Sequence, residues 1–291
     1  MNKGIGIIQI HIAVFLFGFA GLFGKFLQCN PIYIVFGRTL FAFIALFFYA
    51  KLISKTTLSI SFKNSGLLYI LQGILLAVHW WSFFLSIQIS SVAVGLVTFS
   101  TFPLFVTFLE PLFFKEKIVM KNIVLAGMVF IGIVFVIPEY NFSNNITKGA
   151  IFGIISGFTF ALLALVNRKN TKTSNSIAIA FYQNLFACIF LIVPAIMLND
   201  TLPKLDDLPN LILLGVVCTA IAHTLFISSL SFIKAQTASV ITGLEPVYGI
   251  ILAFLILHET PGIRTLAGGL IIIGASIVAS MQAWQKIKVN I

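Results

Sequence analysis

The chain is built from apolar segments of 17 to 25 residues that follow one another almost without interruption. A helix needs roughly 20 apolar residues to cross a bilayer, so each segment is long enough to form one span. Charged or turn-forming residues separate the segments, and the loops leave no room for a soluble domain. The sequence predicts ten spans, at 5–24, 31–50, 66–87, 92–114, 121–137, 149–166, 176–198, 208–232, 235–257 and 263–283.

The composition supports a membrane protein with helical spans. Hydrophobic residues make up 59% of the 291 residues, charged residues only 9%, and the mean hydropathy is +1.10. In lipid, only helices and closed barrels satisfy every backbone polar group. Barrel strands alternate polar and apolar residues, and these segments do not. The predicted fold class is therefore an all-α polytopic membrane protein.

The positions of the basic residues predict how the spans are oriented. With the N-terminus in the cytoplasm, the cytoplasmic side collects thirteen: Lys3, Lys51, Lys55, Lys63, Lys115, Lys117, Lys121, Arg168, Lys169, Lys172, Lys234, Lys286 and Lys288. The other side collects four, Lys25, Lys148, Lys204 and Arg264. Cytoplasmic loops carry an excess of Lys and Arg, so we expect both termini to be cytoplasmic. The net charge of +10 then reflects orientation and not nucleic-acid binding.

The chain lacks the short motifs of several other protein classes. Its three cysteines, Cys29, Cys188 and Cys218, have no spacing typical of a disulfide framework or a metal site. The sequence contains no HExxH, GxSxG or P-loop motif, and its one acidic cluster, Asp206 and Asp207, falls in a short loop. We therefore expect neither an enzyme nor an ATP-driven pump, and no metal or cofactor.

The two halves of the chain repeat each other. Matched residues lie 142 to 145 positions apart: Lys25 with Arg168, Arg38 with Gln183, His79 with His223, Pro103 with Pro246, Glu116 with Glu259, and Gly127 and Gly132 with Gly269 and Gly274. Each half holds five spans, and because five is odd, the second copy is inverted in the membrane. Inverted repeats are typical of transporters, whose substrates bind near the midplane between the copies. We predict repeat units at 1–142 and 143–291.

A short phrase, Leu-Glu-Pro, also occurs twice, around Glu110 and around Glu245. Aligning the two phrases needs an offset of 135, which is out of register with the matched residues on either side. In the register of the repeat, Glu245 corresponds to Phe102 and Glu110 corresponds to Ala253. We expect the two glutamates to lie at different depths and to have different roles.

These features resemble the EamA-type family of the drug/metabolite transporter superfamily. The resemblance rests on the ten spans, the inverted repeat, the Arg38 and Gln183 pair, and the Pro-then-Glu endings Pro103…Glu116 and Pro246…Glu259, and it covers about residues 5–283. It implies secondary transport by alternating access through a cavity lined by spans 1, 3, 4, 6, 8 and 9. Spans 5 and 10 would be peripheral and support packing or dimer contacts. His258, where members often have glycine, and the added acid Glu110 depart from the family pattern.

Glu245 is the main candidate for coupling transport to a proton. It lies about ten residues into the ninth span, beside Pro246, and proline interrupts helical hydrogen bonding. Ionisable groups inside the membrane are costly and often mark transport pathways. A carboxylate at this depth suits a group that takes up and releases a proton; a glutamate that only packs the kink is the alternative. Pro103 and Pro246 are candidate gating positions.

Glu110, Arg38 and Gln183 are interpreted mainly as structural. Glu110 lies near the cytoplasmic end of the fourth span, where Lys115 or Lys117 could pair with it, and a gating or coupling role is the alternative. Arg38 cannot lose its charge, so we expect it to clamp carbonyl groups at a neighbouring helix end, outside the cavity. Gln183 would be its neutral counterpart.

The candidate substrate-binding residues are titratable, hydroxyl and aromatic side chains of the expected cavity spans. Histidine can relay protons or contact substrate, and backbone-bonded core histidines are the alternative. Hydroxyl groups offer hydrogen bonds, and aromatic rings offer an apolar or stacking wall. The set is His79, Trp80, Phe83, Ser100, Thr101, His223, Thr242, Glu245 and Tyr248.

The favoured function is secondary transport of a small polar metabolite, such as an amino acid, with export across the bacterial inner membrane as the favoured direction. An uptake carrier for a nucleoside or S-adenosyl-type metabolite is the alternative, and efflux of a lipid or drug-like compound ranks below both. The expected partners are the substrate and membrane lipid, and the chain would act as a monomer or homodimer.

Overall fold

The computed structural model describes residues 3–58, 66–115, 120–136, 141–198, 200 and 202–289. This described part of the chain is helical and contains no β-strand, which confirms the all-α class. Glu116 of the predicted motif, and Lys63 and Lys117 of the basic-residue count, lie outside the described residues.

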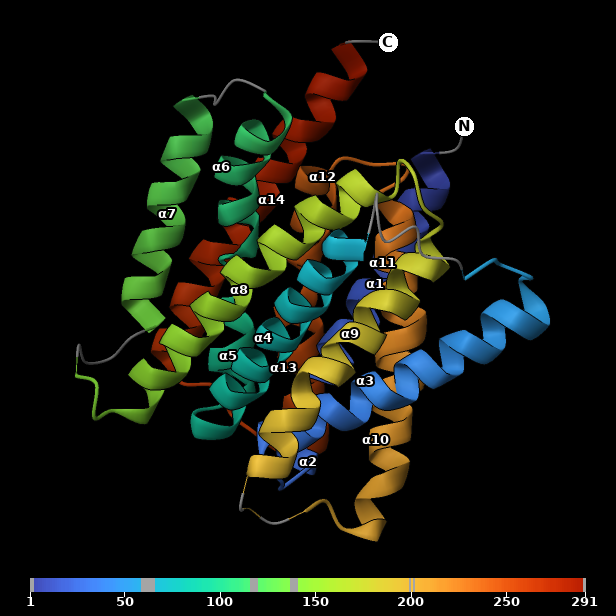
Figure 1. Cartoon of the computed structure of the whole chain (residues 1–291). Helices are drawn as coiled ribbons and strands as arrows, with labels where there is room; N and C mark the ends of the chain where they lie inside the picture. The colour runs from blue at the N-terminus through green and yellow to red at the C-terminus, as the bar shows by residue number, and fades with distance from the viewer. Residues whose placement is uncertain are drawn as a thin grey trace.

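Helices follow one another along both halves of the chain (Figure 1). The first half forms α1 (Lys3–Ala20), α2 (Phe23–Phe26), α3 (Pro31–Phe48), the π-helix η1 (Tyr49–Ile53), α4 (Leu67–Ile89), α5 (Val92–Phe99), α6 (Phe102–Phe114) and α7 (Met120–Val136). The second half forms α8 (Asn145–Asn170), α9 (Ser176–Met197), the 3₁₀ turn η3 (Leu205–Asp207), α10 (Leu208–Gly215), the π-helix η4 (Val216–Ile221), α11 (Ala222–Ser229), α12 (Ala235–Thr242), α13 (Glu245–Leu257) and α14 (Ile263–Val289).

The lengths of the apolar helices support a multi-pass membrane protein. Among the described residues, seven stretches are long and apolar enough to cross a membrane: Gly4–Phe26, Pro31–Ile53, Leu67–Ile89, Val92–Phe114, Asn145–Asn170, Ser176–Met197 and Leu205–Ser229. Shorter apolar helices, Ile123–Val136, Glu245–Leu257 and Ile263–Ala275, fall within the three other expected spans. Helix α1 begins and α14 ends at the same end of the bundle (Figure 1). The number of spans and the side on which the termini lie stay predictions.

Asparagine side chains begin the second span of each half in the same way. Asn30 Oδ1 accepts a hydrogen bond from the Ile32 backbone N–H at 3.0 Å, and Asn175 Oδ1 accepts one from the Ile177 N–H at 2.8 Å. An N-cap side chain satisfies one of the backbone donors that a helix start leaves unpaired. The two caps lie 145 residues apart, which is the spacing that the sequence repeat predicts here.

Two interrupted helices show the repeat most clearly. Helix α5 ends at Phe99 and α6 begins at Phe102; 143 residues later, α12 ends at Thr242 and α13 begins at Glu245. Proline is the second residue of both α6 and α13, where its missing N–H removes no intrahelical bond. The expected kink is therefore a short break between two helices, at the same place in each half.

The ends of α6 and α13 also correspond. Lys115 follows α6 with a φ of 55°, and His258 follows α13 with a φ of 54°. This left-handed conformation is the one that glycine adopts most easily at a helix end, so His258 occupies a position where glycine would fit without strain.

The helix boundaries settle the register of the two Leu-Glu-Pro phrases. Glu245 is the first residue of α13, as Phe102 is the first residue of α6. Glu110 is the ninth residue of α6, as Ala253 is the ninth residue of α13. The two glutamates are not equivalent, as predicted, and they lie at different depths in the bundle.

Helices of each half pack mainly against helices of the other half. Helix α1 packs on α11 and α13, and its counterpart α8 packs on α4, α5 and α6. Helix α3 packs on α9, and α7 packs on α14. Helices α7 and α14 lie toward one edge of the bundle (Figure 1), as the family resemblance implies.

Candidate substrate-binding site

A cavity lies inside the bundle at the break between α12 and α13. It is small: all the space between its lining atoms, including space open to solvent, amounts to about 320 Å³. Its lining residues come from α1, α3, α4, α5, α8, α11 and α13: Phe17, Ala20, Arg38, His79, Trp80, Phe83, Phe99, Phe160, His223 and Glu245. Six of the seven spans involved are those that the resemblance implies, and the second span is an addition.

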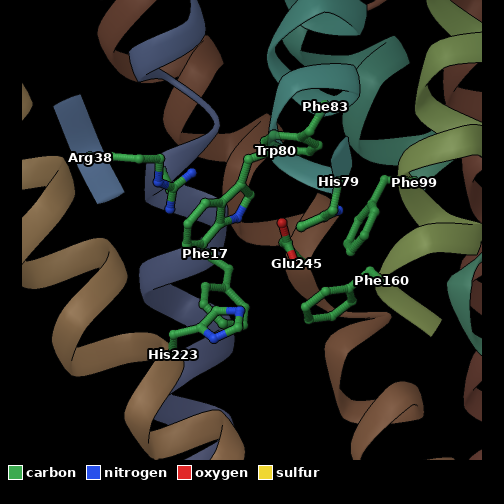
Figure 2. Close-up of a pocket in the computed structure, with 10 residues that line it drawn as sticks. Phe17, Arg38, His79, Trp80, Phe83, Phe99, Phe160, His223 and Glu245 are labelled. Carbon is green, nitrogen blue, oxygen red and sulfur yellow. The ribbon is translucent and has the colours of Figure 1, made fainter. Parts of the chain in front are cut away.

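The Glu245 carboxylate points into this cavity, between Trp80, His79 and Phe160 (Figure 2). The side chain is only 4% exposed, and its Oε2 atom has no hydrogen-bond partner among the described residues. Burial of a carboxylate without a partner is costly, so such a group is expected to have a ligand or a proton as its partner.

Arg38 also lines the cavity, which differs from the prediction that it lies outside. Its Nε donates to Thr219 Oγ1 at 3.0 Å, and Nη2 lies 3.5 Å from the carbonyl oxygen of Cys218. Both acceptors belong to the π-helix η4, so the contact with a neighbouring helix is as expected. The guanidinium carbon lies 3.6 Å from the centre of the Trp80 ring, a cation–π geometry. The second span therefore reaches the cavity because its arginine is long enough to stack on Trp80.

The matched histidines both line the cavity and are held by different partners. His79 Nδ1 lies 2.8 Å from Ser156 Oγ and 3.1 Å from the Ser156 carbonyl oxygen. His223 Nδ1 lies 3.1 Å from Gln183 Nε2. His223 Nε2 has no partner among the described residues. Gln183 thus orients His223, and does not repeat the contacts of Arg38.

Aromatic rings that the sequence did not single out form much of the wall. Phe160 stacks on His79 with ring centroids 4.6 Å apart, and Phe17 lies 5.8 Å from the His223 ring. Phe17 and Phe160 are 143 residues apart, so the repeat could have identified them as a matched pair. Phe99 lies 5.4 Å from His79 and has no aromatic counterpart, since Thr242 stands at its matched position. Trp80 and Phe83, which the sequence predicts as wall residues, also line the cavity.

Four predicted binding residues are buried or packed near the breaks and are not lining residues of this cavity. Ser100 Oγ donates to the Leu96 carbonyl, Thr101 Oγ1 donates to the Thr98 carbonyl, and Thr242 Oγ1 donates to the Ala238 carbonyl, at 2.9–3.0 Å. Hydroxyl groups often bond to the preceding turn of their own helix in this way. Tyr248 packs edge-to-face on Phe15, with ring centroids 5.7 Å apart.

Glu110 lies away from the cavity, between three helices. It forms an ion pair with Arg168 of α8, a partner that sequence reasoning did not identify, and accepts a hydrogen bond from the Gln236 backbone N–H of α12 at 3.2 Å. The carboxylate is 3% exposed. Only the fold could bring Glu110 and Arg168 together, because they are 58 residues apart in different halves.

Within the described part of the chain, no group of three or more His, Cys, Asp or Glu side chains is placed to hold a metal ion. The cavity instead combines one carboxylate, one guanidinium and two imidazoles with aromatic walls. This chemistry is suited to bind a small organic molecule with polar and aromatic parts.

Comparisons with known proteins agree with these features. A relative from Rickettsia bellii, named S-adenosylmethionine uptake transporter, is 25% identical over 284 residues, covering 95% of both chains. A protein of the same name from Rickettsia conorii is 26% identical over 244 residues, covering 84% of this chain and 81% of the relative. A solved crystal structure matches with a TM-score of 0.73 and 12% identity, covering 97% of this chain and 98% of the other, which shows a shared fold.

The family match extends over both repeats. The EamA-like transporter family matches residues 4–137 and again residues 147–281. The two matched regions correspond to the two halves that repeat each other in helix boundaries and packing. The family and the names of the relatives indicate a transporter and not an enzyme. This chain is a multi-pass membrane transporter that belongs to the EamA-like transporter family.

Proposed function

We propose that this chain is a secondary carrier that takes up a small zwitterionic metabolite with an aromatic part, of the S-adenosyl type, by alternating access. The observation that carries the proposal is the buried Glu245 carboxylate facing an aromatic-walled cavity that also contains a guanidinium. The position of Glu245 at a helix break between inverted repeats also supports the proposal, since transporter sites are typically built at such breaks.

The charges of the cavity fit a ligand with both signs. Glu245 offers a negative group for a cation, and the Arg38 guanidinium, on the other side of the Trp80 ring, offers donors for a carboxylate (Figure 2). Arginine is the side chain whose planar fork suits carboxylates best. A ligand whose carboxylate and cation are several bonds apart could contact both groups, one on each side of the ring.

The aromatic walls favour more than a simple amino acid. Phe17, Phe99, Phe160 and Trp80 surround the carboxylate, so a cation bound there lies against π-faces. The same rings can stack on a nucleobase. A sulfonium centre joined to an adenosyl group carries both features, and the names of the Rickettsia relatives support this class for the present chain.

Export of an amino acid is the second candidate. It is favoured by the presence of both charges in a small cavity, because an amino acid is smaller than a nucleoside derivative. The two candidates differ in their substrate and in the direction of transport. Proton coupling through Glu245 is compatible with both.

The membrane arrangement completes the proposal. We infer ten spans with both termini in the cytoplasm, repeat units at 1–142 and 143–291, and a location in the bacterial plasma (inner) membrane. The excess of basic residues on the proposed cytoplasmic side supports the orientation. The chain works as a monomer or a homodimer, since the cavity is formed within one chain.

Counterflow in proteoliposomes tests the substrate. Purified protein would be reconstituted with an excess of one unlabelled compound inside, and entry of the labelled compound would be measured for S-adenosylmethionine, nucleosides and amino acids. Accumulation of labelled S-adenosylmethionine is expected. Accumulation of amino acids alone would support the second candidate, and no accumulation of any compound by folded protein would contradict both and favour a lipid or drug-like substrate.

A further inference from the structure

Two carboxylates bridge the two repeats at different places. Glu259, which follows α13 in the second repeat, accepts hydrogen bonds from the backbone N–H groups of Val92 at 3.3 Å and Ala93 at 3.4 Å. Glu110, in the first repeat, accepts one from the backbone N–H of Gln236 at 3.2 Å. Each repeat thus presents the first turn of an interrupted helix, α5 or α12, to a carboxylate of the other repeat.

The amide positions correspond, although the acids do not. Ala93 and Gln236 are 143 residues apart, the spacing that relates α5 to α12 and α6 to α13. Glu110, in contrast, matches Ala253, and Glu259 matches Glu116, which lies outside the described part of the chain. Acids from different positions therefore reach the same place in two inverted copies, which indicates a shared requirement at both places.

The two contacts lie on opposite sides of the cavity. At about 1.5 Å of rise per residue, each amide lies about 9 Å before the break of its own helix, measured from Ala93 to Phe99 and from Gln236 to Thr242. Helix α12 lies beside α6 toward the end of the bundle that holds the termini, and α5 lies beside α13 toward the other end (Figure 1). The cavity residues Phe99 and Glu245 are between the contacts.

The contacts differ in strength. Helix N-termini carry a partial positive charge, so a carboxylate stabilises each of them. Glu110 is buried and also forms an ion pair with Arg168, whereas Glu259 is half-buried. Lys25, the residue matched to Arg168, instead donates from Nζ to the carbonyl oxygen of Ser90 at 3.1 Å. Removing one member of a buried ion pair leaves the other uncompensated, so the Glu110 contact is the harder one to lose.

We propose that these contacts are the two gates of the cavity. Glu110, with Arg168 and the first turn of α12, closes the end that holds the termini, and Glu259, with the first turn of α5, closes the opposite end. Both gates are closed in this structure. The inference rests on the alternating-access cycle of the proposed function, in which one gate opens while the other stays closed.

Cysteine labelling tests the gates without any substrate. Leu96 in α5 and Ser239 in α12 are fully buried and lie at matched positions, one turn beyond Ala93 and Gln236. Each would be replaced singly by cysteine in a protein whose native Cys29, Cys188 and Cys218 are serine. The rate of reaction with a water-soluble maleimide would then be measured in purified protein with and without Glu110→Gln or Glu259→Gln.

Opposite effects are expected at the two reporters. Glu110→Gln should raise the labelling rate of Ser239→Cys about tenfold or more and leave Leu96→Cys unchanged or slower, because one state gains population at the expense of the other. Glu259→Gln should raise the labelling rate of Leu96→Cys and leave that of Ser239→Cys unchanged or slower. Because each variant is expected to affect one reporter and not the other, general loosening of the fold would not produce this pattern.

Equal increases at both reporters, or no change at either, would overturn the gate assignment. If Glu110→Gln does not yield folded protein, Arg168→Gln breaks the same ion pair from its half-buried side and has the same expected outcome. Because labelling needs no substrate and counterflow with the unaltered protein needs no assigned gate, failure of one proposal is distinguishable from failure of the other.

Discussion

The break between α5 and α6 and the break between α12 and α13 have the same backbone plan and different chemistry. Phe102 opens α6 among rings, with its centroid 4.8 Å from that of Phe160 and 6.0 Å from that of Phe99. Glu245 opens α13 at the matched position and faces the cavity. The repeat therefore sets where a functional residue can lie, and the residue type at one position decides which copy carries the charge.

The largest expected effect comes from removing that charge. Glu245→Gln keeps the shape of the side chain and should lower counterflow about 100-fold or more, because loss of a buried ionic contact costs about 3–5 kcal/mol. Phe102→Leu is the matched control in the other repeat, and we expect it to keep transport within about threefold, since a leucine fills most of the same apolar space. Equal loss of counterflow in both variants would show that the breaks matter only as packing.

Arg38→Lys tests whether the opposite side of the cavity needs a planar cation. Lysine keeps the charge and loses the fork and the stacking on Trp80, so substrate affinity should fall about tenfold. Binding to purified protein measures this effect. An unchanged affinity, with an unchanged melting temperature, would return Arg38 to a purely structural role.

The matched histidines should have smaller and unequal effects. His79→Ala and His223→Ala are each expected to alter substrate affinity, by roughly threefold to tenfold, because single neutral hydrogen bonds contribute about 0.5–1.5 kcal/mol. His223 should matter more, since its Nε2 has no protein partner among the described residues, whereas the Ser156 contacts hold His79. Wild-type affinity in both variants would make them core histidines.

Tyr248→Phe should have the smallest effect. Tyr248 packs on Phe15 of α1 and is not among the lining residues of the cavity, so affinity and counterflow should stay within about twofold of wild type. A larger loss would mean that the cavity extends to Tyr248 during transport.

Sequence patterns predicted the fold because the signals are local and repeated. Apolar runs gave the helices, and pairs such as Pro103 and Pro246 gave the register of the repeat, which the helix boundaries reproduce. His79, Trp80, Phe83, His223 and Glu245 were identified as candidates because polar or aromatic residues at matched depths in a membrane are informative.

The rest of the site depends on side-chain reach and on which helices meet. The prediction that Arg38 lies outside the cavity was wrong. Its position in the second span does not show that its side chain reaches the Trp80 ring of another helix. The hydroxyl groups of Ser100, Thr101 and Thr242 bond back to carbonyl groups of the preceding helical turn, which no spacing rule distinguishes from groups that face a ligand. The pairing of Glu110 with Arg168 joins residues from separate helices and is visible only in three dimensions.

The most direct test of the account compares two ligands that differ by one charge. Binding of S-adenosylmethionine, a sulfonium cation, and of S-adenosylhomocysteine, its neutral thioether, would be measured by calorimetry with the unaltered protein and with Glu245→Gln. We predict that the unaltered protein prefers the sulfonium about tenfold or more and that the variant loses this preference while still binding the thioether. A variant that keeps the full preference would contradict the assignment of Glu245 as the partner of the substrate cation.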